Sequence, residues 1–263
     1  MGKEICDNIN PYTHLRDDFI FFFDKVVKID LKNDDFDFDI IIKFLEKIYS
    51  LKFANEHDIT SWNDYTFANF KFFIHELFLY LIAIGLKNEN YVFIEEILYS
   101  AYFLNDPYSS KNEPKHYNSF FGYIDNKIKS YYNEANSNNF LSPMADLMIK
   151  RSPEWFDKDD LINADLLCHY VSVLPENKYK WFPITYIYQK NKRFDLFQRL
   201  VSNRHFEKIK ILFNVNTIED LKKKLKEIAE KDNNPLGIGY QNSSSHVEPI
   251  YNIIDVESIG TTR

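Results

Sequence analysis

The chain has 263 residues, of which 45% are hydrophobic, 27% charged and 17% aromatic, and its formal net charge is −7. This apolar content is enough for a substantial buried core, and the composition excludes a disordered, collagen-like or disulfide-stapled chain. No uninterrupted apolar run reaches the roughly 18 residues of a membrane span, and the two cysteines are far apart, so a reduced, cytoplasmic protein is expected.

Helical periodicity runs through most of the chain, because apolar residues recur at every third or fourth position. In chain order, the pattern predicts helices over 15–29, 38–51, 61–86, 91–103, 118–133, 142 onward, 161–174, 193–200, 206–213 and 217–231. Ser142 followed by Pro143, and Thr217 followed three residues later by Asp220, are typical helix starts. The helix that ends near Leu86 is apolar nearly all round, which predicts a buried, central position.

Glycine is scarce in the body of the chain. Between Lys3 and Lys231 only Gly85 and Gly122 occur. Hairpin turns and phosphate-binding loops need glycine, where the backbone takes a positive φ or closely approaches a ligand. This distribution excludes a β-sandwich, a Rossmann domain and a P-loop fold, and with them most nucleotide-dependent enzymes.

The patterns together predict an all-α fold. We expect a compact bundle of about nine or ten helices, or a stack of helix pairs, over residues 1–231, with a polar tail over 232–263 that is flexible or docks on a partner. The tail contains one short apolar segment, whose residues are the candidates for docking. They are Ile250, Tyr251, Ile253 and Ile254.

No motif indicates a metal or a cofactor. His75-Glu76 has no second histidine four residues later, where Leu79 stands, so a zinc-protease motif is excluded. The acidic residues of 34–39 lack the glycine and the closing glutamate of a calcium-binding loop. We therefore expect neither a metal site nor a bound cofactor.

The charge is unevenly distributed. Residues 178–231 carry fourteen Lys or Arg against six Asp or Glu, so this segment has a formal charge of +8, whereas the tail carries −3 and the first 177 residues −12. Such a split favours a surface that meets an acidic partner, either nucleic acid or protein. The alternatives are that the basic segment folds against the acidic first part of the same chain, residues 1–177, or that its lysines are a solvated helix face. The candidate binding residues are Lys208, Lys210, Lys222, Lys223, Lys224 and Lys226.

Arg199 precedes His205 by six residues, and this spacing resembles the Arg-x(4–6)-His motif of HEPN ribonucleases, which are also all-helical. The resemblance implies that His205 would move a proton at the 2′-hydroxyl or leaving group while Arg199 holds the phosphate. Leu200 stands where the motif has a polar residue, and Ser202-Asn203 is more typical of a helix break. The other interpretation makes His205 a capping or surface residue.

The segment 193–231 is similar to the closing helices of uncharacterised bacterial multidomain proteins, some of which accompany effector domains in antiphage defence. The resemblance covers about forty residues, from Arg193-Phe-Asp-Leu-Phe through His205-Phe-Glu-Lys to Thr217-Ile-Glu-Asp. It implies no activity of its own. We therefore expect a non-catalytic interaction or scaffolding subunit of a bacterial defence system, whose partner is an effector subunit or a second copy. The alternatives are an RNA-cleaving HEPN-like enzyme and a nucleic-acid-binding module.

Overall fold

The computed structural model of the chain describes residues 1–30, 37–53, 65–107, 113–173, 181–188, 194–231 and 254–263. Within these ranges every regular element is a helix, and the β-bridges are two isolated pairs, Tyr102–Lys115 and Ser202–Thr262. The predicted all-α class is therefore confirmed. The described residues fall into two compact units, Met1–Asp160 and Leu161–Arg263, inside what the sequence presents as one helical region.

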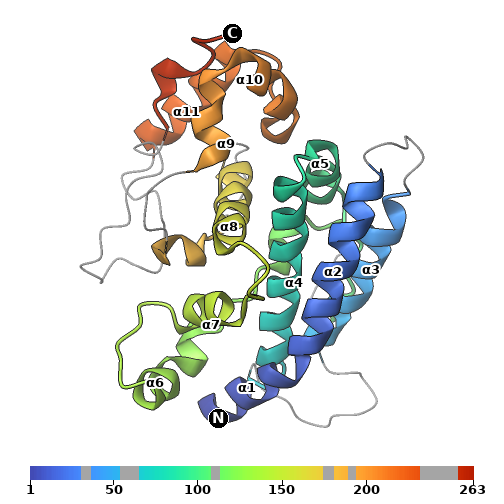
Figure 1. Cartoon of the computed structure of the whole chain (residues 1–263). Helices are drawn as coiled ribbons and strands as arrows, with labels where there is room; N and C mark the ends of the chain where they lie inside the picture. Colours follow the sequence, from blue (N-terminus) through green and yellow to red (C-terminus); the bar gives the residue numbers. More distant parts are fainter. Residues whose placement is uncertain (31–36, 54–64, 108–112, 174–180, 189–193, 232–253) are drawn as a thin grey trace. The chain divides into compact units, whose positions relative to one another are not determined.

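The described part of the chain contains eleven α-helices, whose arrangement within each unit can be followed in Figure 1. Unit 1 contains α1 (Gly2–Ile9), α2 (Thr13–Asp30), α3 (Asp39–Tyr49), α4 (Ala68–Lys87), α5 (Tyr91–Tyr99), α6 (Asp125–Ala135) and α7 (Pro143–Arg151). Helix α8 (Lys158–Val173) crosses the unit boundary, and unit 2 continues with α9 (Asp195–Gln198), α10 (Asn203–Ile209) and α11 (Ile218–Lys231).

Helix α4 is the central helix of unit 1, as its all-round apolar pattern predicts. It packs against α1, α2 and α5 (Figure 1). Its length and apolar composition would suffice to cross a membrane, but 83% of its apolar window is buried inside the protein, which is typical of a core helix. At Gly85 a Cβ atom would lie 2.5 Å from Ile94 Cγ1, so glycine allows the close approach of α4 and α5.

Several predicted helices have different bounds in the structure, among them those over 91–103 and 118–133. The segment 91–103 is helical only to Tyr99, and in 118–133 a short 3-10 turn at Tyr117–Phe120 precedes α6, which begins at Asp125. Between these two elements, Gly122 lies so close to the neighbouring backbone that a Cβ atom would be 2.2 Å from the Lys71 carbonyl oxygen, so glycine allows this approach. The first four residues of the helix predicted over 61–86 lie outside the described residues, and the described helix α4 begins at Ala68.

Helix α1 was not predicted. The first predicted helix begins at Leu15, yet Ile5, Cys6 and Ile9 form a buried face of α1 that packs against α4 and α6. Their spacing of one, three and four residues is typical of one helical face. The polar residues between them concealed the pattern.

Unit 2 is organised around a buried carboxylate on α8. Asp165 accepts hydrogen bonds from the Trp181 indole nitrogen at 2.6 Å and from the Thr185 backbone nitrogen and hydroxyl, each at 2.7 Å. Burial raises the pKa of Asp165 to about 6, although these three donors act in the opposite direction. The segment 181–188 is thereby held on α8, and the 3-10 helix Ile184–Tyr188 follows directly after Pro183.

Candidate functional site

The six candidate lysines lie on α10, the 3-10 turn after it and α11. A capping box begins α11, because the Asp220 backbone nitrogen donates to Thr217 Oγ1 at 3.1 Å and the Thr217 nitrogen donates to Asp220 Oδ2 at 3.2 Å. Leu221 and Leu225 form the buried face of this helix. The lysines therefore lie on its half-buried and exposed sides.

Contacts within unit 2 are made by Lys210, Lys222, Lys224 and Lys226. Lys210 pairs with Glu207 at 2.7 Å, and Lys224 donates to the Asn214 carbonyl at 3.1 Å. Lys222 and Lys226 both contact Glu257. These partners, Glu207, Asn214 and Glu257, all belong to unit 2 and lie outside the acidic first 177 residues. Lys208 and Lys223 are exposed.

The end of the chain packs on unit 2 through a short segment, residues 254–263, which we call the C-terminal strap. Lys226 Nζ lies 2.6 Å from Glu257 Oε1, and Lys222 Nζ donates to the Glu257 carbonyl at 3.2 Å. The pairing with Lys226 lowers the pKa of Glu257 below its usual value. These contacts join the acidic strap to the basic helix α11.

Backbone hydrogen bonds fix the strap to the turn between α9 and α10. The Gly260 nitrogen donates to the Leu200 carbonyl at 2.8 Å, the Thr262 nitrogen to the Val201 carbonyl at 2.9 Å, and the Asn203 nitrogen to the Thr262 carbonyl at 2.8 Å. We expected the whole of 232–263 to be flexible or to dock on a partner, but these last ten residues pack on their own chain. Of the candidate docking residues, Ile254 is buried there, and Ile250, Tyr251 and Ile253 lie outside the described part.

Replacing Gly260 with alanine should release the strap. Gly260 has a φ of +71°, which an alanine adopts at a cost, and its Cβ would lie 2.3 Å from Ile218 Cδ1. We expect strap docking to weaken by about 1–2 kcal/mol. Hydrogen exchange of the peptide that covers 254–263 measures this effect directly. An Arg263→Ala variant, which changes an exposed side chain at the same end, should leave the exchange unchanged. Equal exchange in both variants would contradict the prediction.

Arg199 and His205 lie in different environments, since the first is exposed to solvent and the second is buried. Arg199 is exposed in the 3-10 helix Arg199–Val201, and Ser202 then has an extended backbone before α10 begins. His205 is buried on α10, and its Nε2 lies 3.2 Å from the Leu196 carbonyl oxygen, within hydrogen-bond distance. The break at Ser202 that the sequence suggests is present. His205 is therefore neither a capping nor a surface residue, but a core histidine in contact with the backbone.

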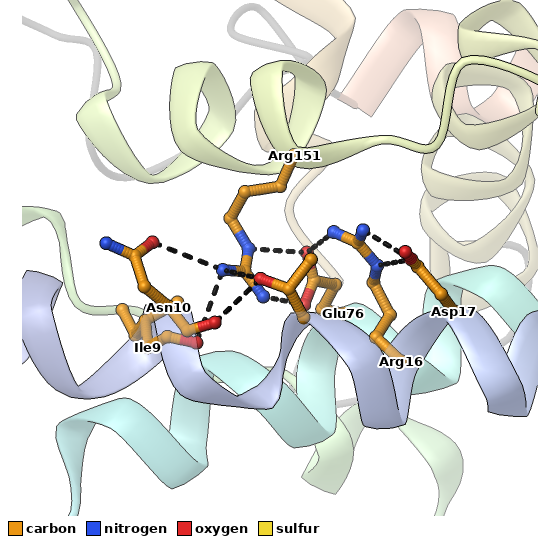
Figure 2. Close-up of polar contacts among 7 residues, drawn as sticks. Ile9, Asn10, Arg16, Asp17, Glu76 and Arg151 are labelled. Atoms are coloured by element: carbon orange, nitrogen blue, oxygen red, sulfur yellow. Dashed lines mark hydrogen bonds and ion pairs between the residues drawn. The ribbon is translucent and has the colours of Figure 1, made fainter.

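A buried ionic cluster lies in unit 1 (Figure 2). Glu76, on α4, is fully buried, and both of its carboxylate oxygens accept hydrogen bonds from Arg151 of α7. Arg151 Nε lies 3.2 Å from Oε1, and Arg151 Nη2 lies 3.3 Å from Oε2. Arg16, on α2, lies 3.4 Å from the same Oε1 and also donates to Asp17 at 2.9 Å. Two guanidinium groups thus share one buried carboxylate.

The remaining donors of Arg151 go to the turn between α1 and α2. Its Nη1 donates to Thr13 Oγ1 at 2.9 Å and to the Ile9 carbonyl at 3.2 Å, and it lies 3.4 Å from Asn10 Oδ1 (Figure 2). One side chain therefore ties α7 to α4 and to the N-terminal helices. Because Glu76 and Asp17 balance the two arginines, the cluster is electrically neutral, which favours a structural role over anion binding.

Two buried bases lie close together near the Gly122 contact. Burial lowers the pKa of His75 to about 3 and that of Lys52 to about 7, and the positive charge of Lys52 adds to the effect on His75. Lys52 donates to the Ser119 carbonyl at 2.7 Å and lies 4.7 Å from the centre of the Tyr49 ring. No group of three or more His, Cys, Asp or Glu side chains arranged to bind a metal occurs in the part of the chain that the structure describes.

His75 should make unit 1 sensitive to acid. The unfolded chain binds a proton at His75 near pH 6.5, whereas the folded chain does so only near pH 3, so the folded state binds fewer protons within this window. Acidification therefore favours unfolding, and between pH 7 and pH 4 we expect a loss of about 3 kcal/mol from this group.

Urea denaturation across this pH range, followed by circular dichroism, measures the slope. A His75→Leu variant should lose most of it, whereas His14→Leu, which replaces an exposed histidine of the same unit, should keep it. A His75→Leu variant with the full wild-type slope would contradict the assignment.

An exposed apolar surface covers α2 and α3. Its α2 residues include Phe21, Phe22 and Ile29, with exposed fractions of 59%, 58% and 66%. We call this the α2–α3 surface and define it by its exposed members, which are Leu15, Phe21, Phe22, Ile29, Ile40 and Leu51. Phe19 on α2 and Phe44 on α3 stack beneath it with ring centres 5.9 Å apart. On α2, Leu15, Phe22 and Ile29 are spaced by seven residues and share one side of the helix, and exposed apolar side chains on one side are typical of a binding surface.

Comparisons with protein-family models, with curated proteins and with solved structures found no match to this chain. The fold and these sites define an all-helical protein with structural buried ionic groups and an exposed apolar surface. The sequence missed this surface and the Glu76 cluster. The sequence did contain an indication of this surface, because the segment 15–29 has more apolar residues than one buried helical face requires.

Proposed function

We propose that this chain is a non-catalytic interaction or scaffolding subunit of a bacterial intracellular system, of the kind that serves antiphage defence. The observation that carries the proposal is the α2–α3 surface. Phe22 and Ile29 are more than half exposed although each could bury most of its side chain against a partner, and burying such a side chain contributes about 1.5–3 kcal/mol. The cytoplasm is the compartment that we propose for it.

The chemistry of the buried polar groups supports a non-catalytic role. Glu76 is neutralised by two arginines, Asp165 accepts three hydrogen bonds, and His205 contacts a backbone carbonyl. Each of these groups is engaged in holding helices or turns together. A general acid or base needs, in contrast, an open approach to a substrate proton.

Affinity capture from the native host tests the proposal. Tagged wild-type chain should retain a defined protein, either another subunit or the untagged chain, and Phe22→Glu should lose it. Val92→Glu is the matched control, because Val92 is 54% exposed on α5 of the same unit but lies outside the α2–α3 surface. Retention that is equal in the two variants, or absent from the wild type, would contradict the proposal.

The nuclease alternative rests on the exposed guanidinium group of Arg199 six residues before His205. Incubation of purified chain with single-stranded RNA, beside His205→Ala, tests it. Cleavage that depends on His205 would favour the HEPN-like function over scaffolding. Retention of RNA at low salt, reduced by a Lys208→Ala/Lys223→Ala variant and by added salt, would instead favour a nucleic-acid-binding module.

A further inference from the structure

Helix α2 carries two separate apolar faces. Its inner face contains Ile20, Phe23 and Val27, which are buried against the rest of unit 1. A second stripe consists of five residues at alternating spacings of four and three. They are Leu15, Phe19, Phe22, Val26 and Ile29. At 3.6 residues per turn this stripe runs along a line about 120° from the inner face.

The second stripe has the spacing of a coiled-coil seam. Residues repeated at four and three positions are the a and d positions of a heptad, and they stay on one side of a helix over several turns. Leu15, Phe22 and Ile29 are exposed to 47%, 58% and 66%, so these three positions face outward, whereas Phe19 and Val26 are half-buried and Phe19 stacks on Phe44 of α3. A helix that serves only the core of its own chain needs one apolar face.

Opposite charges border the seam on the side away from α3. Asp18 and Lys25 are exposed and lie seven residues apart, so they occupy the same heptad position, next to the apolar stripe. Lys25 also lies 5.2 Å from the centre of the Phe21 ring. The seam therefore has an acidic end and a basic end on one edge.

We propose that the α2–α3 surface binds a second copy of this chain, with the two α2 helices antiparallel about a two-fold axis close to Phe21 and Phe22. This inference rests on the proposed function and names the partner of the same surface. In this arrangement Phe22 packs against the partner's Phe19, and Val26 against the partner's Leu15. The two-fold axis produces each contact twice.

The charges favour a second copy over an unrelated protein. The antiparallel register that pairs the apolar residues also brings Asp18 opposite the partner's Lys25, and Lys25 opposite the partner's Asp18. An acidic and a basic residue equally spaced about the axis make the edge complementary to itself. A uniformly acidic or basic partner would match only one end of it.

Helix α3 extends the contact. Ile40 and Leu51 are exposed to 66% and 43% at the two ends of the helical segment that packs beside α2 through Phe44. Stable dimers bury about 800 Å² on each partner, which requires more than one helical stripe. Two such α2–α3 hairpins would form a four-helix arrangement across the axis.

Sedimentation equilibrium of the full chain tests the pairing. We expect wild-type and Val92→Glu chains to be dimers of twice 31.5 kDa, and Phe22→Glu to raise the dissociation constant at least about 100-fold, because two carboxylates would be buried at the axis. Circular dichroism should show the same helix content in all three. A monomeric wild-type chain at about 100 μM would overturn the proposal.

A charge exchange tests the register. Asp18→Lys and Lys25→Asp should each weaken the dimer about tenfold, because each places like charges opposite one another twice, and the double variant should restore wild-type affinity. Single variants without effect, or a double variant weaker than both, would overturn the antiparallel pairing. If Phe22→Glu loses a different protein in affinity capture while the purified wild type is monomeric, the proposed function stands and this inference fails.

Discussion

Replacing Glu76 with leucine is expected to lower the free energy of unfolding of unit 1 by about 3–5 kcal/mol, because it leaves Arg16 and Arg151 buried without their shared carboxylate. Both guanidinium groups are at least nine-tenths buried, so water cannot replace the lost partner. Urea denaturation monitored by circular dichroism gives the difference. Glu134→Gln, which neutralises an exposed glutamate on α6, should change the stability by less than about 0.5 kcal/mol.

A compensated variant separates the charge effect from a packing effect. Arg16→Met/Glu76→Leu/Arg151→Met removes all three charges, and apolar replacements of a complete buried ionic group are often neutral or stabilising. We expect it to recover most of the stability that Glu76→Leu loses. If the triple variant is as unstable as Glu76→Leu, the loss comes from packing and hydrogen bonds rather than from uncompensated charge.

Replacing Asp165 with alanine should destabilise unit 2 by about 3–5 kcal/mol. The change leaves the Trp181 indole nitrogen and both Thr185 donors buried without an acceptor, and each such group costs about 1–3 kcal/mol before the structure relaxes. Hydrogen exchange of the peptides that cover α8 reports the loss locally, and the emission of the buried Trp181 should shift to longer wavelength.

The matched control for Asp165 is an exposed acidic residue of the same unit. Glu227→Ala on α11 should leave exchange in α8 as it is in the wild type. Exchange in α8 of Asp165→Asn should lie between that of Asp165→Ala and that of Glu227→Ala. The asparagine amide oxygen can still accept a hydrogen bond, whereas its amide nitrogen would face other donors. An Asp165→Ala chain with wild-type protection in α8 would show that the segment 181–188 is held by other contacts.

The helices follow from the sequence because their information is local. The spacing of Leu221 and Leu225 and the Thr217–Asp220 box predict α11, and both are present. The central position of α4 follows from its all-round apolar pattern. The short helix α1 could not be predicted in this way, because three buried residues among polar ones give only a weak helical periodicity.

The contacts between distant segments could not be predicted in this way. Glu76 meets Arg16 and Arg151, which are 60 and 75 residues away in sequence, and no periodicity links them. The positive charge of residues 178–231 can be counted from the sequence, but only the structure shows that Lys222 and Lys226 contact Glu257 in the strap. On α2 the sequence showed abundant apolar residues without showing which of them face outward.

The most direct test of the proposed pairing is a disulfide cross-link across α2. Chains with Asp18→Cys mixed with chains with Lys25→Cys should form a covalent dimer under mild oxidation, because the antiparallel register brings these two positions together. Each variant alone should cross-link much less, since like positions are about two helical turns apart. The native Cys6 and Cys168 are buried and free, so they interfere little. No cross-link in the mixture, or equal cross-linking in all three samples, would contradict α2 pairing.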